Sequence, residues 1–114
     1  MTTHKYLCLY RSSPSAASEP PSPVQMQAMF AAFNAWKDKF KDSIHDLGTK
    51  LRPSGKVVAV SGVTDGPYVE AKEVVAGYMI LSVESYDAAV AVVREMPGID
   101  MPGARVEIRE MMSF

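Results

Sequence analysis

The sequence predicts an α+β fold in which two helices cover one face of an antiparallel sheet. Three observations predict it. The chain has 114 residues, which is enough for one domain with a single hydrophobic core. Its composition, 47% hydrophobic and 22% charged, is that of a globular protein. Its apolar periodicity changes along the chain in the order strand, helix, strand, strand, helix, strand.

The N-terminal segment is predicted to be a short strand followed by a loop. Residues 5–10, KYLCLY, are apolar on both alternating sets of positions, so neither face of this strand is expected to contact water. Cys8 lies inside it and is interpreted as a small buried hydrophobe, because a reactive thiol needs exposure and a nearby cation. Residues 11–23 hold four prolines and five serines and are predicted to be a loop within a single domain, residues 1–114.

A long amphipathic helix is predicted next. Ser22, Pro23 and Gln25 form an N-terminal signal, with serine as the cap and glutamine three residues later. Apolar residues then recur every three or four positions, and Gly48 is expected to end the helix. We expect this stripe to pack in the core and part of it to line a pocket. Its members are Met26, Met29, Phe30, Phe33, Trp36, Phe40, Ile44 and Leu47.

The remaining segments complete the predicted sheet. Residues 56–63 form the second strand, and TDGP forms its hairpin turn, because Asp-Gly favours positive backbone angles. A return strand is expected over about residues 68–84, with a bulge or a close approach at Gly77. Ser85 caps a second helix, YDAAVAVVREM, and ARVEIREMM forms the last strand. The order β-α-β-β-α-β is a ferredoxin-like arrangement.

Charge and spacing argue against several function classes. Lys plus Arg number 12 and Asp plus Glu number 13, so no basic surface is predicted for nucleic acid or anionic lipid. Neither a signal-peptide pattern nor an apolar run of roughly 20 residues is present, so we expect a soluble, cytoplasmic protein. No metal or cofactor is predicted, because one cysteine and two histidines lack ligand spacing. His45 is expected at the end of the first helix, near Asp42, as a solvated side chain.

Residues 64–85, TDGPYVEAKEVVAGYMILSVES, resemble the signature of the YCII-related family in its DGPF-domain branch. The resemblance extends over nearly the whole chain, from KYLCLY to VEIREMM. Tyr68 stands for the usual phenylalanine, Ala71 for threonine and Ala76 for the first of two glycines. The narrower YCII branch has a histidine in the first turn of the first helix, one half of a proposed His-Asp pair. That region reads PVQMQAM here, so this chemistry is not carried over.

The resemblance implies that ferredoxin-like units pair sheet to sheet into a dimeric α+β barrel. The residues agree with it, because two helices cover only one face of a four-stranded sheet. The segments YLCLY, VVAV and YMILSV are nevertheless apolar on both faces. Burial of each large apolar side chain contributes roughly 1.5–3 kcal/mol. We therefore expect a homodimer.

Candidate ligand-binding residues gather around the same motif. In an extended strand, Tyr68, Glu70 and Lys72 share a face, with the last two about 6.5–7 Å apart along the backbone. The alternative is that Glu70 and Lys72 form a surface ion pair, Asp65 caps its own turn and Tyr68 packs. The predicted cleft residues are Asp65, Tyr68, Glu70, Lys72, Glu73, Trp36 and Tyr78.

Two functions remain open from the sequence. The first is a homodimer that binds a small molecule in this cleft, with or without catalysis of a reaction. The second is a non-catalytic accessory or regulatory module, because the resemblance implies a link to extracytoplasmic-function sigma factors, beside which DGPF-domain relatives are often encoded. The residues do not decide between them.

Overall fold

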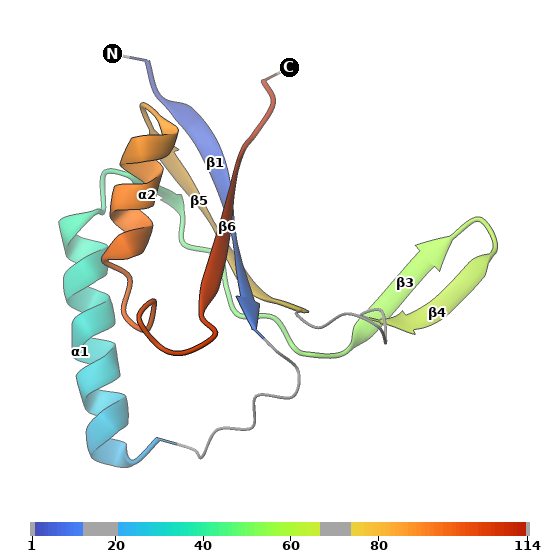
Figure 1. The fold of residues 1–114 in the computed structure, drawn as a ribbon, viewed down its shortest axis with the longest axis horizontal. Coiled ribbons are helices and arrows are strands. Elements are labelled where there is room, and N and C mark those ends of the chain that lie inside the picture. Colours follow the sequence, from blue (N-terminus) through green and yellow to red (C-terminus); the bar gives the residue numbers. More distant parts are fainter. Residues whose placement is uncertain (1, 13–20, 67–73, 114) are drawn as a thin grey trace.

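A computed structural model describes residues 2–12, 21–66 and 74–113, and the fold is given for these residues. In chain order the elements are β1 (His4–Ser12), α1 (Pro23–Lys39), β2 (Ile44–Asp46), β3 (Gly55–Ala59), β4 (Gly62–Gly66), β5 (Val74–Val83), α2 (Tyr86–Arg94) and β6 (Arg105–Glu110). Figure 1 shows both helices on one side of the main sheet and the β3–β4 hairpin projecting from the other side. We call this hairpin, residues 55–66, the arm.

The main sheet has four strands in the order β2-β5-β1-β6, and every neighbouring pair is antiparallel. With the arm set aside, the chain runs β-α-β-β-α-β through this sheet, so the structure is compatible with the predicted ferredoxin-like arrangement. One prediction is wrong, because residues 56–63 do not supply the second strand of this sheet. The short strand β2 does, and the arm is inserted between β2 and β5.

The hydrophobic core lies between the main sheet and the two helices. Strand alternation directs Tyr6 and Cys8 into it and leaves Leu7 and Leu9 on the opposite face of β1. Its buried members are Tyr6, Cys8, Trp36, Met79, Leu81, Val83, Ala89, Val92 and Val93. Both helices therefore contribute to one core on one face of the sheet, as predicted.

The first helix is shorter than predicted and ends at Lys39. Phe40 is its C-cap, and the chain then joins the sheet, where Ser82 donates its backbone N–H to the carbonyl of Ser43 at 2.8 Å. Ile44 continues the helical spacing, but the same apolar side chain also fits a strand position beside β5, and the sheet pairing prevails. His45 consequently lies exposed in β2, so its predicted place in the last helical turn is wrong.

Only the second half of the predicted helical stripe packs in the core. Trp36 is buried, and Phe33 and Phe40 pack against the same cluster. Met26, Met29 and Phe30 are 44%, 53% and 61% exposed, so their predicted burial is wrong for this chain on its own. Figure 1 gives the reason, since the N-terminal half of α1 extends past the end of α2. No helix in the described ranges is long and apolar enough to cross a membrane.

The predicted hairpin exists, but its turn lies elsewhere. Ala59 pairs with Gly62, so Val60 and Ser61 form a two-residue loop, and Gly62 has a φ of 141°. Asp65 and Gly66 lie in β4, where Asp65 pairs with Lys56, and the predicted TDGP turn is therefore wrong. The Asp-Gly signal competed with a Ser-Gly pair four residues earlier that brings Val58 opposite Val63.

The irregularity predicted at Gly77 is confirmed. Tyr10 pairs with Gly77 and Arg11 with Val75, so Ala76 is the extra residue of a bulge. A Cβ atom on Gly77 would lie 3.2 Å from the carbonyl oxygen of Thr49, which makes this a close approach of two backbones. The predicted return strand is present as β5 from Val74, while its residues 68–73 lie outside the described ranges.

Candidate functional site

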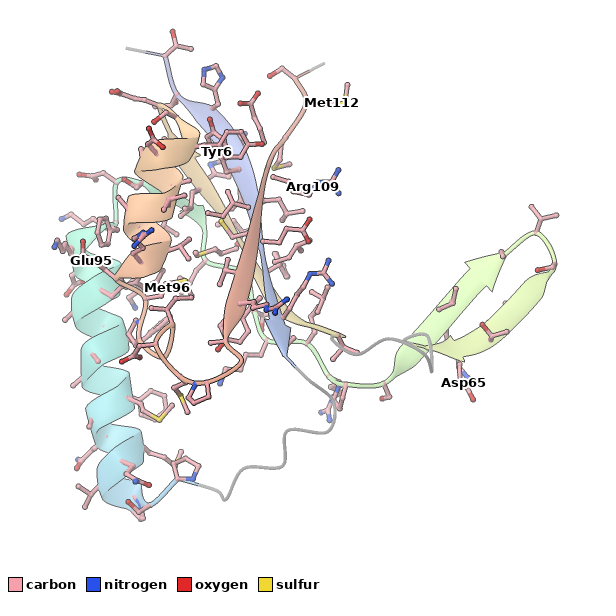
Figure 2. All side chains as sticks on the ribbon, in the orientation of Figure 1. Tyr6, Asp65, Glu95, Met96, Arg109 and Met112 are labelled. Atoms are coloured by element: carbon pink, nitrogen blue, oxygen red, sulfur yellow. The ribbon has the colours of Figure 1, made fainter. Side chains whose placement is uncertain are left out.

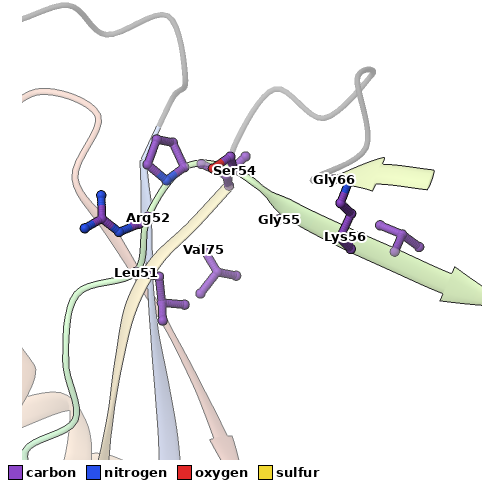
Figure 3. Close-up of a pocket in the computed structure, with 10 residues that line it drawn as sticks. Leu51, Arg52, Ser54, Gly55, Lys56, Gly66 and Val75 are labelled. Carbon is purple, nitrogen blue, oxygen red and sulfur yellow. The ribbon is translucent and has the colours of Figure 1, made fainter. Parts of the chain in front are cut away.

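A hollow of about 220 Å³ lies where the arm leaves the main sheet. Figure 3 shows Leu51 and Val75 on the side of β5 towards the arm, Lys56 on the arm, and the guanidinium of Arg52 extending away from the arm. The lining residues are Leu51, Arg52, Pro53, Ser54, Gly55, Lys56, Val57, Gly66, Val74 and Val75. Three structural segments therefore form it: the stretch before the arm, the arm base and the start of β5.

Backbone contacts hold these segments together. Leu51 donates its N–H to the carbonyl of Ala76 at 2.8 Å, which fixes the first segment against the bulge of β5. Gly66 has to be small at the arm base, because a Cβ there would lie 2.8 Å from Cγ2 of Val57. The missing side chain leaves room for Val57 to form part of the wall.

The walls of the hollow are mainly apolar, and its charge lies at the rim. Lys56 forms an ion pair with Asp65 across the arm. Arg52 is exposed and makes no ion pair with any residue in the described ranges. A guanidinium presents several N–H donors to a carboxylate or a phosphate. The arrangement therefore suits a small molecule that has an apolar body and an anionic group.

The structure does not bring the three described members of the predicted cleft together. Asp65 lies on the arm, away from the main sheet, with its side chain 87% exposed (Figure 2). Tyr78 lies in β5 on the face opposite the core, paired with Leu9. Trp36 is 5% exposed in the core, where its indole N–H donates to the carbonyl of Val92 at 3.0 Å.

The other predicted residues, Tyr68, Glu70, Lys72 and Glu73, lie outside the described ranges. Their segment connects Gly66 to Val74, and both of these flanking residues line the hollow. Sequence reasoning missed Leu51, Arg52 and Ser54, because TKLRPSG reads as an ordinary connecting segment. The one available signal was an arginine next to proline immediately before a strand, and this pattern is common in loops.

A second feature is the face of the main sheet that the helices do not cover. Leu7 and Leu9 of β1 lie on it opposite Ile80 and Tyr78 of β5, and all four side chains are half-buried. We call these four residues the open face. Arg11 and Glu107 form an ion pair of 2.7 Å beside it, on the same side of the sheet by strand alternation. The open face is therefore an apolar strip with a charged border.

Comparison with known families identifies the fold family. The family model of the YCII-related domain matches residues 4–113, which is nearly the whole chain. The chain belongs to the YCII-related domain family. A comparison with curated proteins gave no match. Family membership agrees with the mixed α+β fold, and the DGPF branch remains a prediction.

The buried titratable groups of this YCII-related domain are structural. Burial raises the pKa of the Cys8 thiol from its ordinary 9.0 to about 11, which disfavours the nucleophilic thiolate. Burial, and then the charge of Glu110, raise the pKa of Tyr6, whose hydroxyl donates to the Glu110 carboxylate at 3.3 Å. The described residues contain no cluster of three His, Cys, Asp or Glu suited to a metal. The hollow and the open face are thus the candidate functional features described so far.

Proposed function

We propose that this YCII-related chain is a small-molecule-binding homodimer. Its subunits associate through their open faces into a dimeric α+β barrel, and the ligand occupies the hollow at the base of the arm. The observation that carries the proposal is the open face itself. Four large apolar side chains lie there on the two central strands, and both helices of the same chain lie on the other side.

The open face is suited to a second copy of the same sheet. Face-to-face sheets pack about 10 Å apart by interdigitating their side chains, and a strip of leucine, isoleucine and tyrosine supplies such a layer. Burial of each large apolar side chain contributes up to roughly 1.5–3 kcal/mol, and symmetry doubles the number of side chains. The charged pair at its border, Arg11 and Glu107, favours a polar rim.

The hollow favours a small ligand. Its volume of about 220 Å³ is below the range of about 300–1,000 Å³ that is usual for drug-sized ligands. Apolar contacts would come from Leu51, Val57 and Val75, and Arg52 would bind the anionic group. We keep Tyr68, Glu70, Lys72 and Glu73 as further ligand-binding candidates, because their segment begins and ends at lining residues.

Analytical ultracentrifugation tests the association. We expect a dimer for the wild type at micromolar concentration and a folded monomer for Leu9→Arg, because the arginine places a charge in the apolar strip. Val90→Arg is the matched control, since Val90 is 37% exposed on α2, on the helical side of the sheet. A wild type that remains a folded monomer at 100 micromolar would contradict the dimer.

A thermal-shift screen with small carboxylic acids and phosphate monoesters tests the hollow. We expect ligands that raise the melting temperature of the wild type and of Arg94→Gln, a surface control on α2, but not of Arg52→Gln. Loss of the same shifts in Glu70→Ala or Lys72→Ala would add those residues to the site. No shift with any compound would contradict the ligand site, and co-purification with a sigma factor would then favour the accessory-module alternative.

A further inference from the structure

The arm exposes more apolar surface than its own chain covers. Val58 and Val63 are direct cross-strand partners on one face of the arm, and they are 75% and 62% exposed. Val60 at the tip is fully exposed. Near the base of the same face lies the ion pair of Lys56 with Asp65. The arm therefore has exposed apolar side chains towards its tip and an ion pair near its base.

Within the described ranges, the arm is a sheet of its own. Its ladder joins β3 only to β4, and neither strand pairs with the main sheet. An isolated two-stranded hairpin is marginally stable in water, and it usually becomes stable through a third strand or through packing on another layer. The exposed valines indicate the face on which such a layer would pack.

The direction of the arm points to what supplies this layer. Figure 1 shows that the arm projects from the side of the main sheet opposite the helices, which is the side of the open face. Each arm strand has five residues and so spans about 17 Å. Two sheets packed face to face lie about 10 Å apart. An arm of this length therefore reaches past the sheet of a subunit docked on the open face.

The total exposed area supports a large contact between copies. The chain exposes 8874 Å², whereas a compact monomer of its mass exposes about 6100 Å². Its radius of gyration is 16.0 Å, against about 13 Å for a compact domain of this length. The difference is about 2800 Å² for the whole chain, and a standard interface buries roughly 800 Å² per partner. A pair of open faces together with two arms is an interface of the required kind.

We infer that the arm is a clasp for a second copy of this chain, with its Val58–Val63 face packed against the other subunit. This inference rests on the proposed dimer and adds a consequence for the ligand site. Four of the residues that line the hollow, Gly55, Lys56, Val57 and Gly66, belong to the arm. Docking of the arm therefore holds one wall of the hollow in place.

Charge substitutions on the two faces of the arm test the clasp by analytical ultracentrifugation. We expect Val58→Asp and Val63→Asp each to weaken the dimer at least tenfold. Thr64→Asp is the matched control, since Thr64 is exposed on the same strand as Val63 but on the opposite face of the arm. The dimer affinity of this variant should equal that of the wild type. A wild-type dimer combined with unaltered affinity in both valine variants would overturn the clasp while leaving the open-face dimer intact. A monomeric wild type would overturn both.

Crosslinking provides a second measurement that does not depend on weakening the dimer. Val60→Cys in a Cys8→Ala background carries one thiol, at the tip of the arm, for a photoactivatable maleimide. In a mixture of isotopically heavy and light chains, we expect crosslinks between heavy and light peptides, at a yield that follows the dimer fraction. Crosslinks only within one chain, in a sample that sediments as a dimer, would overturn the clasp.

Discussion

The main sheet and the arm are both antiparallel structures that contain valines, yet their apolar side chains are buried to very different degrees. In β5 every second residue from Gly77 to Val83 is buried. In the arm, Val58, Val60 and Val63 are among the most exposed side chains of the chain. The strands of the sheet face a helical layer, whereas no such layer covers the arm among the residues that the structure describes. A valine is thus buried where a second layer packs on its strand. Strand propensity does not predict whether that layer is present.

The largest expected effect tests this difference directly. Leu81→Ala should lower the free energy of unfolding by about 2–5 kcal/mol, because Leu81 is 0% exposed and its removal leaves a cavity in the core. Val60→Ala at the arm tip should change it by less than about 0.5 kcal/mol. Urea denaturation of both variants in the monomeric Leu9→Arg background makes the comparison. Equal losses would show that the arm tip is covered by its own chain.

Two glycine substitutions compare a backbone position packed against the main sheet, Gly48, with one in an open loop, Gly103. Gly48 and Gly103 have similar positive φ values, 68° and 80°, so alanine at either position costs about 1–2 kcal/mol in backbone strain. A Cβ on Gly48 would also clash with the carbonyl oxygen of Tyr78, while nothing lies within 4 Å of one on Gly103. We expect Gly48→Ala to lower the free energy of unfolding by about 2–4 kcal/mol, clearly more than Gly103→Ala. Equal losses in urea denaturation would mean that the backbone at Gly48 moves away from Tyr78 without a further loss of free energy.

Local signals in the sequence predicted the elements that depend on local chemistry. The capping box at Ser22 forms as expected, with the Gln25 N–H donating to the serine hydroxyl at 3.2 Å and the Gln25 side chain accepting from Ser22 at 2.8 Å. Ser85 caps α2 in the same way, through the N–H of Ala88. The short apolar segment KYLCLY predicted β1, and the long apolar return segment predicted β5.

Tertiary pairing decided the features that the sequence did not reveal. Strand β2 has three residues and exists because it lies beside β5, so helical spacing extended the first helix across Ile44 instead. The hollow depends on how residues 51–57, 66, 74 and 75 approach one another in space, and Arg52 carries no pattern of its own. Of the seven predicted site residues, Asp65, Trp36 and Tyr78 lie on the arm, in the core and on the open face. Asp65 and Tyr78 share a motif in the sequence, but the structure does not bring them together with each other or with Trp36.

The core also has a predicted dependence on alkaline pH, which comes from Cys8. The pKa of Cys8 is about 11 in the folded chain and 9.0 when exposed, so the unfolded chain loses this proton first. The stabilisation is complete below about pH 9 and is lost as pH rises towards 11, by about 3 kcal/mol in total. Urea denaturation of the wild type and of Cys8→Ala across this range measures it. Tyr6 contributes to both proteins, so parallel curves would contradict the assignment to Cys8.

The smallest expected effect concerns the ion pair at the base of the arm. The side chains of Lys56 and Asp65 are 68% and 87% exposed, and solvent screens such a pair to less than about 1 kcal/mol. A double-mutant cycle of Lys56→Ala and Asp65→Ala, measured by urea denaturation in the Leu9→Arg background, should give a coupling energy below this value. The same cycle in the wild-type dimer should give a larger coupling, because a docked arm would exclude water from the pair. Equal coupling in monomer and dimer would place this end of the arm in solvent in both states, and would restrict the clasp to Val58, Val60 and Val63.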